Sequence, residues 1–324
     1  MVKRPWLVPL AFLLVYVIWG STYLAIKISI DTIPPFVMAG VRFLVAGAAL
    51  YAGARLSGAP APVGVEWRTA GIVGLFLLLG GNGGVVMAQK SVPSGLAALL
   101  VAGVAIWMAI FDALRPGGRW PSWPVALGLL GGLAGVGLLM SGKGEGSVDP
   151  FGAALLVGAT ISWAIGSIYA RGARLPKSAF VATAVEMMAG GLGLMLLAGV
   201  TGQWGQLDLK AVTAASIVAM VYLAVFGSIV AFTAYVWLLS VRPPSVVATY
   251  AYVNPVVAVT LGAIFLGEAL TPRIVVAAAA ILGSVAVITT FSKSQSRQGS
   301  PESSRVAITD DRLPIAGQPT ERNG

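Results

Sequence analysis

Ten apolar runs of about twenty residues each follow one another along this chain and limit what it can fold into. They lie at approximately 9–29, 35–56, 69–89, 95–114, 122–141, 151–170, 179–200, 212–239, 245–266 and 272–291. A run of about 20 apolar residues crosses the hydrocarbon of a membrane as an α-helix, whereas a membrane-spanning β-strand is half as long and alternates in polarity. A helix also satisfies its own backbone hydrogen bonds in lipid. We therefore predict an all-α polytopic membrane protein with ten transmembrane helices.

The composition excludes several classes of function. Apolar residues make up 57% of the 324 positions and charged residues 10%, which is far from the composition of a soluble domain. The chain contains no histidine and no cysteine, so it has neither an imidazole base nor a thiolate metal site. We expect no enzymatic activity and no cofactor. The net charge of +9 is typical of basic residues beside a membrane, so we expect no nucleic-acid partner.

The distribution of basic residues predicts the orientation. If the N-terminus is cytoplasmic, ten basic residues lie in inside connections and four in outside connections. The inside set is Lys3, Arg4, Arg55, Arg68, Arg115, Arg119, Arg171, Arg174, Lys177 and Arg242, and the outside set is Lys90, Lys143, Lys210 and Arg273. The positive-inside rule then places both termini in the cytoplasm. The polar segment 292–324 is predicted to be a disordered cytoplasmic tail.

The chain also repeats itself at an offset of 144 residues. The superposed pairs are Trp19 with Trp163, Lys27 with Arg171, Phe36 with Phe180, Val37 with Val181 and Val41 with Val185. A Pro-Ser pair at 93–94 recurs at 244–245. A unit of five spans is odd in number, so its second copy enters the membrane from the opposite side. We predict an inverted repeat of residues 1–143 and 144–291, an architecture that alternating-access transporters use.

Two segments resemble a known family. The segment YAYVNPVVAVTLGAIFLGEALTPRIVVAAAAILGSVAVI at 250–288 is similar to the closing part of EamA repeats in the drug/metabolite transporter superfamily, and the Trp-Gly-Ser-Thr at 19–22 resembles their opening motif. The resemblance implies a ten-helix inner-membrane carrier that exports amino acids, other metabolites or drugs. The first copy departs from the pattern because Trp120 stands where the second has Glu268. We interpret Glu268 as a structural cap at a helix boundary.

The sequence GGNGG at 80–84 lies in the middle of an otherwise apolar run. Its glycines allow close helix packing, and Gly80 with Gly84 forms a GxxxG pair. Packing alone does not call for Asn82, because an amide in hydrocarbon is costly unless it is hydrogen-bonded. We therefore also predict that this helix bends beside a water-filled cavity, where Asn82 presents its amide to a substrate.

Other polar and aromatic residues near the middle of the membrane extend the predicted site. Trp19 and Trp163 lie at equivalent repeat positions far from the interfaces that tryptophan prefers. As site residues they would form flat apolar walls, and the alternative is that they pack in the core. The residues predicted to hydrogen-bond the substrate are Ser21, Tyr23, Ser167, Tyr250 and Asn254.

Arg42 and Glu186 are charged residues at matching places in the second and seventh apolar runs. Charges this deep in a membrane by default mark a transport pathway. We predict that they are coupling or gating residues, with Glu186 binding a proton and a substrate ammonium in turn. The alternatives are a structural ion pair or a residue exposed to a water-filled vestibule.

These features predict a secondary transporter that exports small metabolites, mainly amino acids or related zwitterions, by alternating access. Its partners would be the substrate and the lipid bilayer, with proton coupling through Glu186. One alternative is a multidrug exporter of lipophilic cations, in which Glu186 would bind the positive charge. Another is a membrane-embedded lipid-modifying enzyme, which would need an acid/base or nucleophile constellation, and Glu186 with Arg42 gives thin support for one.

Overall fold

The computed structural model describes residues 6–114, 122–141, 149–241, 247 and 250–298. Every regular element in these residues is a helix. Seven helices are long and apolar enough to span a membrane, and three shorter apolar helices cover Trp123–Leu139, Val253–Leu266 and Pro272–Ile288. Together they form the ten predicted spans, so the all-α prediction is confirmed.

The helices of the first half follow the predicted runs closely. They are α1 (Leu7–Ser29), α2 (Pro35–Leu56), a third span made of α3 (Gly64–Gly74), the π-helix η1 (Leu75–Asn82) and α4 (Gly83–Ala88), a fourth made of α5 (Ser94–Ala102) and α6 (Val104–Leu114), and α7 (Trp123–Met140). The hydrophobic pattern therefore fixes where each span lies, although it does not show that the third contains a π-helix.

The second half repeats this organisation. Its helices are α8 (Pro150–Gly172), α9 (Ala179–Val200), an eighth span made of α10 (Ala214–Tyr222), the π-helix η2 (Leu223–Val230) and α11 (Ala231–Val241), then α13 (Tyr250–Leu266) and α14 (Pro272–Gln298). The predicted start of the disordered tail at Ser292 is too early, because α14 continues to Gln298. Residues 299–324 of the predicted tail lie outside the described residues. So do several residues used above for orientation and repeats, namely Lys3, Arg4, Arg115, Arg119, Trp120, Lys143, Pro244, Ser245 and Arg242.

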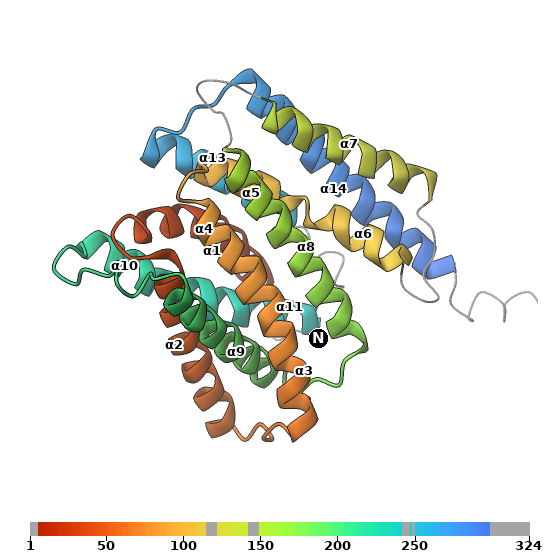
Figure 1. Cartoon of the computed structure of the whole chain (residues 1–324). Helices are drawn as coiled ribbons and strands as arrows, with labels where there is room; N and C mark the ends of the chain where they lie inside the picture. The colour runs from red at the N-terminus through yellow and green to blue at the C-terminus, as the bar shows by residue number, and fades with distance from the viewer. Residues whose placement is uncertain (1–5, 115–121, 142–148, 242–246, 248–249, 299–324) are drawn as a thin grey trace, which may run out of the picture.

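The two halves are interleaved, and the most extensive helix contacts all join one half to the other. The second helix of each half packs on the other (α2 on α9), as does the fifth (α7 on α14), and both pairs lie side by side in Figure 1. The remaining contacts come in matching sets: α1 contacts η2 and α13, while α8 contacts η1 and α6. This exchange of equivalent partners is the arrangement expected of an inverted repeat.

Asp149 links the two halves where α8 begins. Its side chain accepts a hydrogen bond from the Gly152 backbone N–H at 2.8 Å, and the Ser91 hydroxyl donates to the same carboxylate at 2.8 Å. These two hydrogen bonds, mainly the one from Gly152 and then the one from Ser91, hold the pKa of the Asp149 carboxyl below its ordinary value. The first turn of α8 is thus capped and tied to the connection between α4 and α5.

Glu268 forms a second link of this kind. Its carboxylate accepts the backbone N–H groups of Ser94 and, at 2.9 Å, of Gly95. Glu268 is therefore a helix cap, but it caps α5 in the other half rather than its own helix. A negative charge at this position also complements the helix dipole.

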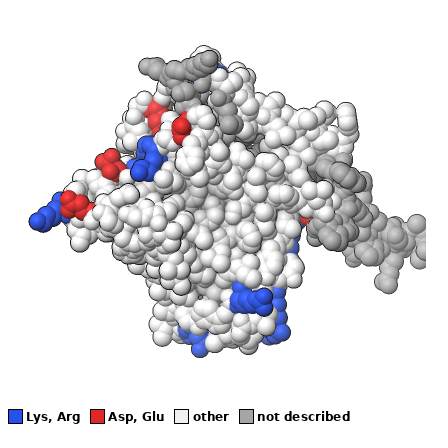
Figure 2. Space-filling view, in the orientation of Figure 1, with Lys and Arg blue, Asp and Glu red and all other residues white. Residues whose placement is uncertain are grey.

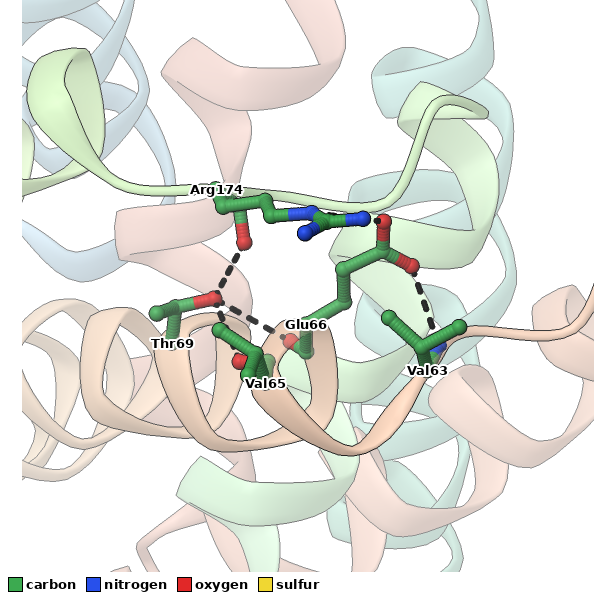
Figure 3. A network of polar contacts seen from close by, with 5 residues as sticks. All are labelled: Val63, Val65, Glu66, Thr69 and Arg174. Atoms are coloured by element: carbon green, nitrogen blue, oxygen red, sulfur yellow. Dashed lines mark hydrogen bonds and ion pairs between the residues drawn. The ribbon is translucent and has the colours of Figure 1, made fainter.

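A third link joins the two halves at the start of α3 (Figure 3). The Glu66 carboxylate accepts from the Val63 backbone N–H at 3.0 Å and lies 3.8 Å from the Arg174 guanidinium. The Thr69 hydroxyl donates to the Arg174 carbonyl. These bonds hold the start of α3 to the connection between α8 and α9.

Charged side chains gather at the two ends of the molecule and leave a broad uncharged surface between them (Figure 2). In this view the lower end shows only Lys and Arg, and the upper end shows both signs. Large apolar side chains such as Leu130, Leu196 and Ile264 are exposed. An apolar belt of this kind is what a lipid-facing surface requires.

Candidate functional site

Two π-helices occupy matching places in the third and eighth spans. A π-helix inserts one extra residue into a helical turn, which widens the helix and weakens the regular backbone pairing, and such segments occur frequently at functional sites. The predicted irregularity at GGNGG corresponds to η1, which ends at Asn82. The sequence analysis did not predict η2, because its segment LAVFGSIV contains a single glycine.

The glycines of GGNGG bring the third span against α8. A Cβ atom at Gly80 would collide with the Ser162 hydroxyl, and one at Gly84 would lie 2.9 Å from the Ala159 Cβ. The Ser162 hydroxyl donates to the Phe76 carbonyl at 2.7 Å and so provides a partner for the backbone of η1. The packing interpretation of these glycines is therefore confirmed.

Asn82 differs from the glycines around it. Its side chain is half-buried, and no described residue makes a hydrogen bond to its carboxamide. An amide within a membrane span that has no protein partner can hydrogen-bond water or a solute. This geometry is compatible with the predicted contact between Asn82 and substrate.

Trp163 and Trp19 each pack on the π-helix of the other half. A Cβ atom at Gly81 of η1 would lie 2.8 Å from the Trp163 ring, which is 36% exposed. The Trp19 indole N–H donates to the Gly227 carbonyl of η2 at 3.0 Å. The Ser167 hydroxyl, on the same helix as Trp163, is exposed and donates to the Trp163 carbonyl at 2.8 Å. Each tryptophan thus contacts the π-helix of the other half, Trp19 through an indole hydrogen bond and Trp163 through its ring.

Trp19 also belongs to an aromatic cluster, which we define as Trp19, Tyr235 and Tyr250. The Trp19 ring centroid lies 5.1 Å from that of Tyr235 and 5.0 Å from that of Tyr250, and the two tyrosine rings are 5.8 Å apart. Ser21 lies two residues after Trp19 on α1 and shares a hydrogen bond of 2.6 Å with the Tyr222 hydroxyl. The structure therefore places Tyr250 against Trp19, and Ser21 against Tyr222, the residue that precedes η2.

Tyr23 and Asn254, two further residues of the predicted site, lie outside the aromatic cluster. Tyr23 packs against the hydrophobic core that α4, α5 and α8 share. Asn254 lies between α13 and α1, where its amide nitrogen can donate to the carbonyls of Tyr250 and Tyr16 at 3.2 Å. Each lies four residues along its helix from a member of the aromatic cluster. Their contacts join neighbouring helices and do not extend the cluster.

Arg42 extends from α2 to η2. Its Nε donates to the Ser228 hydroxyl at 3.0 Å, and that hydroxyl donates to the Leu223 carbonyl at 3.1 Å. The sequence analysis missed Ser228, although a serine within an apolar run is a signal that could have identified it. The contact joins residues of the two halves, and the hydrophobic pattern contains no information about it.

Glu186 occupies the matching place beside η1. Its backbone lies against Gly74, the last residue of α3, where a Cβ atom would lie 2.7 Å from the Glu186 Cα. Its side chain is half-buried. The ion pairs found among the described residues, Arg171 with Asp112 and Arg174 with Glu66, do not involve it. In this conformation Arg42 and Glu186 are thus separate, each beside the π-helix of the other half.

The sequence model of the EamA-like transporter family matches residues 6–141 and 150–290, which is most of the chain in two copies. The chain belongs to the EamA-like transporter family. This EamA-like protein is therefore a multi-pass membrane transporter of small molecules and not an enzyme.

Named relatives and a solved structure agree with this membership. The EamA-like chain is 41% identical to the "Uncharacterized inner membrane transporter YedA" of Escherichia coli (strain K12) over 282 residues, which cover 86% of this chain and 89% of that one. It is 31% identical to the "Probable amino-acid metabolite efflux pump" of the same strain over 168 residues, 48% of this chain and 51% of that one. A crystal structure with 23% identity has a TM-score of 0.60 and covers 90% of this chain and 99% of its own, which supports the fold alone.

Proposed function

We propose that this EamA-like transporter exports amino acids or related small zwitterions across a bacterial inner membrane by alternating access, with both termini in the cytoplasm. The proposal rests mainly on one observation. In each half a mid-membrane tryptophan packs on the π-helix of the other half. Asn82, whose amide has no hydrogen-bond partner among the described residues, ends one of these π-helices. Aromatic surface with amide and hydroxyl groups suits a small solute that has both apolar and polar parts. The similarity to a relative named "Probable amino-acid metabolite efflux pump" is consistent with this proposal.

In this proposal Trp19 and Trp163 form the apolar walls of the site. Hydrogen bonds to the substrate come from Asn82 and from the hydroxyl groups of Ser21 and Tyr250. The residues Tyr23, Ser167 and Asn254 complete the site when the halves exchange conformations. Because the contacts of the two halves match, each π-helix can take up in one state the arrangement that the other has in the opposite state.

Transport by purified protein in liposomes tests this proposal. Liposomes loaded with a mixture of radiolabelled amino acids should release at least one of them at a rate that saturates with concentration. The second candidate, export of lipophilic cations, is favoured by the half-buried carboxyl of Glu186 without an ion-pair partner among the described residues. Flux of cationic dyes without flux of any amino acid would establish that candidate and reject the first.

Proton coupling through Glu186 makes a separate prediction. A single carboxylate can hold a proton or a substrate ammonium group but not both, which is the minimal requirement for exchange. Glu186→Gln should therefore remove the pH dependence of flux between about pH 5.5 and 8 while downhill exchange of substrate continues. Arg42→Gln should impair transport without removing the pH response.

Glu66→Gln is the matched control, because it makes the same change at a carboxyl outside the candidate site (Figure 3). This variant should keep the pH profile of the unmodified protein. Initial rates measured across the pH range decide the question, and an unaltered profile in Glu186→Gln would reject coupling through this residue.

A further inference from the structure

Arg42 is a charged residue that the described structure satisfies only in part. Its side chain is 6% exposed. Nε bonds to Ser228, and the guanidinium carbon lies 4.6 Å from the centroid of the Phe43 ring. Nη1 is buried and makes no hydrogen bond within the described residues. One edge of the guanidinium is thus held in place while another edge remains without a partner.

A buried guanidinium of this kind is costly. Removing a cation from water is repaid only if a partner of opposite charge or several hydrogen bonds replace the lost hydration. No carboxylate of the described residues lies within ion-pair distance of Arg42, and Glu186 is on the side of α9 that faces α3. Charged residues inside membrane spans mark the paths of solutes. The compensating negative charge is therefore expected from a ligand.

The neighbours of Arg42 orient the guanidinium. Ser228 is fixed by its bond to the Leu223 carbonyl of η2, so the Nε edge cannot rotate freely. The guanidinium also lies beside Gly227, where a Cβ atom would be 3.4 Å from Nη2, an ordinary contact distance. The Gly227 carbonyl accepts the indole N–H of Trp19. The guanidinium and the aromatic cluster therefore meet at a single residue of η2.

We propose that the unpaired edge of Arg42 binds the carboxylate of the transported amino acid, while the aromatic cluster contacts the remainder of the molecule. A guanidinium presents parallel N–H donors that match the two oxygens of a carboxylate, which a lysine ammonium does not. The substrate then supplies the negative charge that Glu186 does not supply in this conformation. This inference rests on the proposed function and adds that the carboxylate is required.

Competition in liposomes tests the requirement. For each amino acid that the unmodified protein transports, the unlabelled amino acid and its carboxamide are compared as inhibitors of flux. The carboxamide keeps the side chain and the ammonium group and lacks the carboxylate. Truncating one partner of a buried charged pair costs 2 kcal/mol or more, so the carboxamide should inhibit at least about thirtyfold more weakly.

Two variants test whether Arg42 causes the difference in inhibition between an amino acid and its carboxamide. Arg42→Gln should weaken inhibition by the amino acid and leave inhibition by the carboxamide unchanged, so that the ratio of the two falls toward one. Ser228→Ala should lower the ratio in part, because it removes the hydrogen bond that holds Nε of Arg42. This variant tests the same assignment if Arg42→Gln does not fold. Thr260→Ala is the control, because Thr260 is exposed on α13 and, among the described residues, its hydroxyl donates to the Val256 carbonyl of its own helix. It should keep the ratio of the unmodified protein.

The possible results separate this inference from the proposed function. If amino acids are transported but their carboxamides inhibit equally well, or if Arg42→Gln and Ser228→Ala keep the original ratio, the Arg42 assignment is overturned and amino-acid export stands. If no amino acid is transported, the proposed function fails and this inference fails with it.

Discussion

Gly74→Ala should prevent stable assembly of the protein, whereas Gly71→Ala should have little effect. A Cβ atom at Gly74 would collide with the carbonyl oxygen of Glu186 and lie 2.7 Å from its Cα, and both contacts are to backbone. Backbone atoms cannot move aside as a flexible side chain does, so α3 and α9 would have to separate. At Gly71 the nearest neighbour is the Ala189 Cβ at 3.7 Å, an ordinary contact.

The expected loss of stability in Gly74→Ala follows from the way helices associate in lipid. Close approach of backbones supplies much of the interaction between helices, because hydrocarbon surrounds them on all sides and no hydrophobic force drives them together. Overpacking costs typically about 1–3 kcal/mol and more where the backbone must shift. Size-exclusion chromatography and thermal unfolding in detergent measure the outcome. Equal yield and equal midpoint temperature for the two variants would show that α3 and α9 do not pack as described.

Asn82→Leu should leave the protein folded and reduce transport about tenfold to hundredfold. The Asn82 amide has no hydrogen-bond partner among the described residues, so its removal breaks no hydrogen bond between them. A hydrogen bond to a charged group of the substrate would be worth about 1.5–3 kcal/mol, which sets the expected loss. The leucine would also narrow the space beside η1.

The matched control is Thr260→Leu, which introduces the same residue at an exposed position of α13. Both variants should unfold at the temperature of the unmodified protein, and only Asn82→Leu should lose flux in liposomes. If Asn82→Leu transports normally, GGNGG serves packing alone and Asn82 must be removed from the site.

The positions of the spans could be predicted because hydropathy is a local property of the chain. Pro35–Leu56 and Ala179–Val200 coincide with predicted runs. The equivalence of Trp19 and Trp163 could be predicted because it rests on spacing within the repeat. Their contacts could not, since each joins a helix of one half to a π-helix of the other.

The π-helices mark a second limit of prediction. The segment GGNGG indicates the irregularity at η1, because glycine and asparagine are unusual in an apolar run. The segment LAVFGSIV of η2 has no such signal and is typical of an ordinary apolar helix. Its widened turn is held from outside by Arg42 through Ser228 and by Trp19 through Gly227. Glu268 shows the same limit. The sequence predicts that it caps a helix, but the helix that it caps begins at Ser94, far away in the chain.

The interleaving of the two halves has a consequence for how the protein is made. Synthesis runs from the N-terminus, so the first five spans emerge while their main packing partners do not yet exist. The first half would insert into the bilayer as separate helices, with Arg42 and the glycine surfaces of α3 and α4 facing lipid or other proteins. Final assembly must wait until α8 and α9 arrive, and a fragment that ends before them would be a target for quality-control proteases rather than a folded domain.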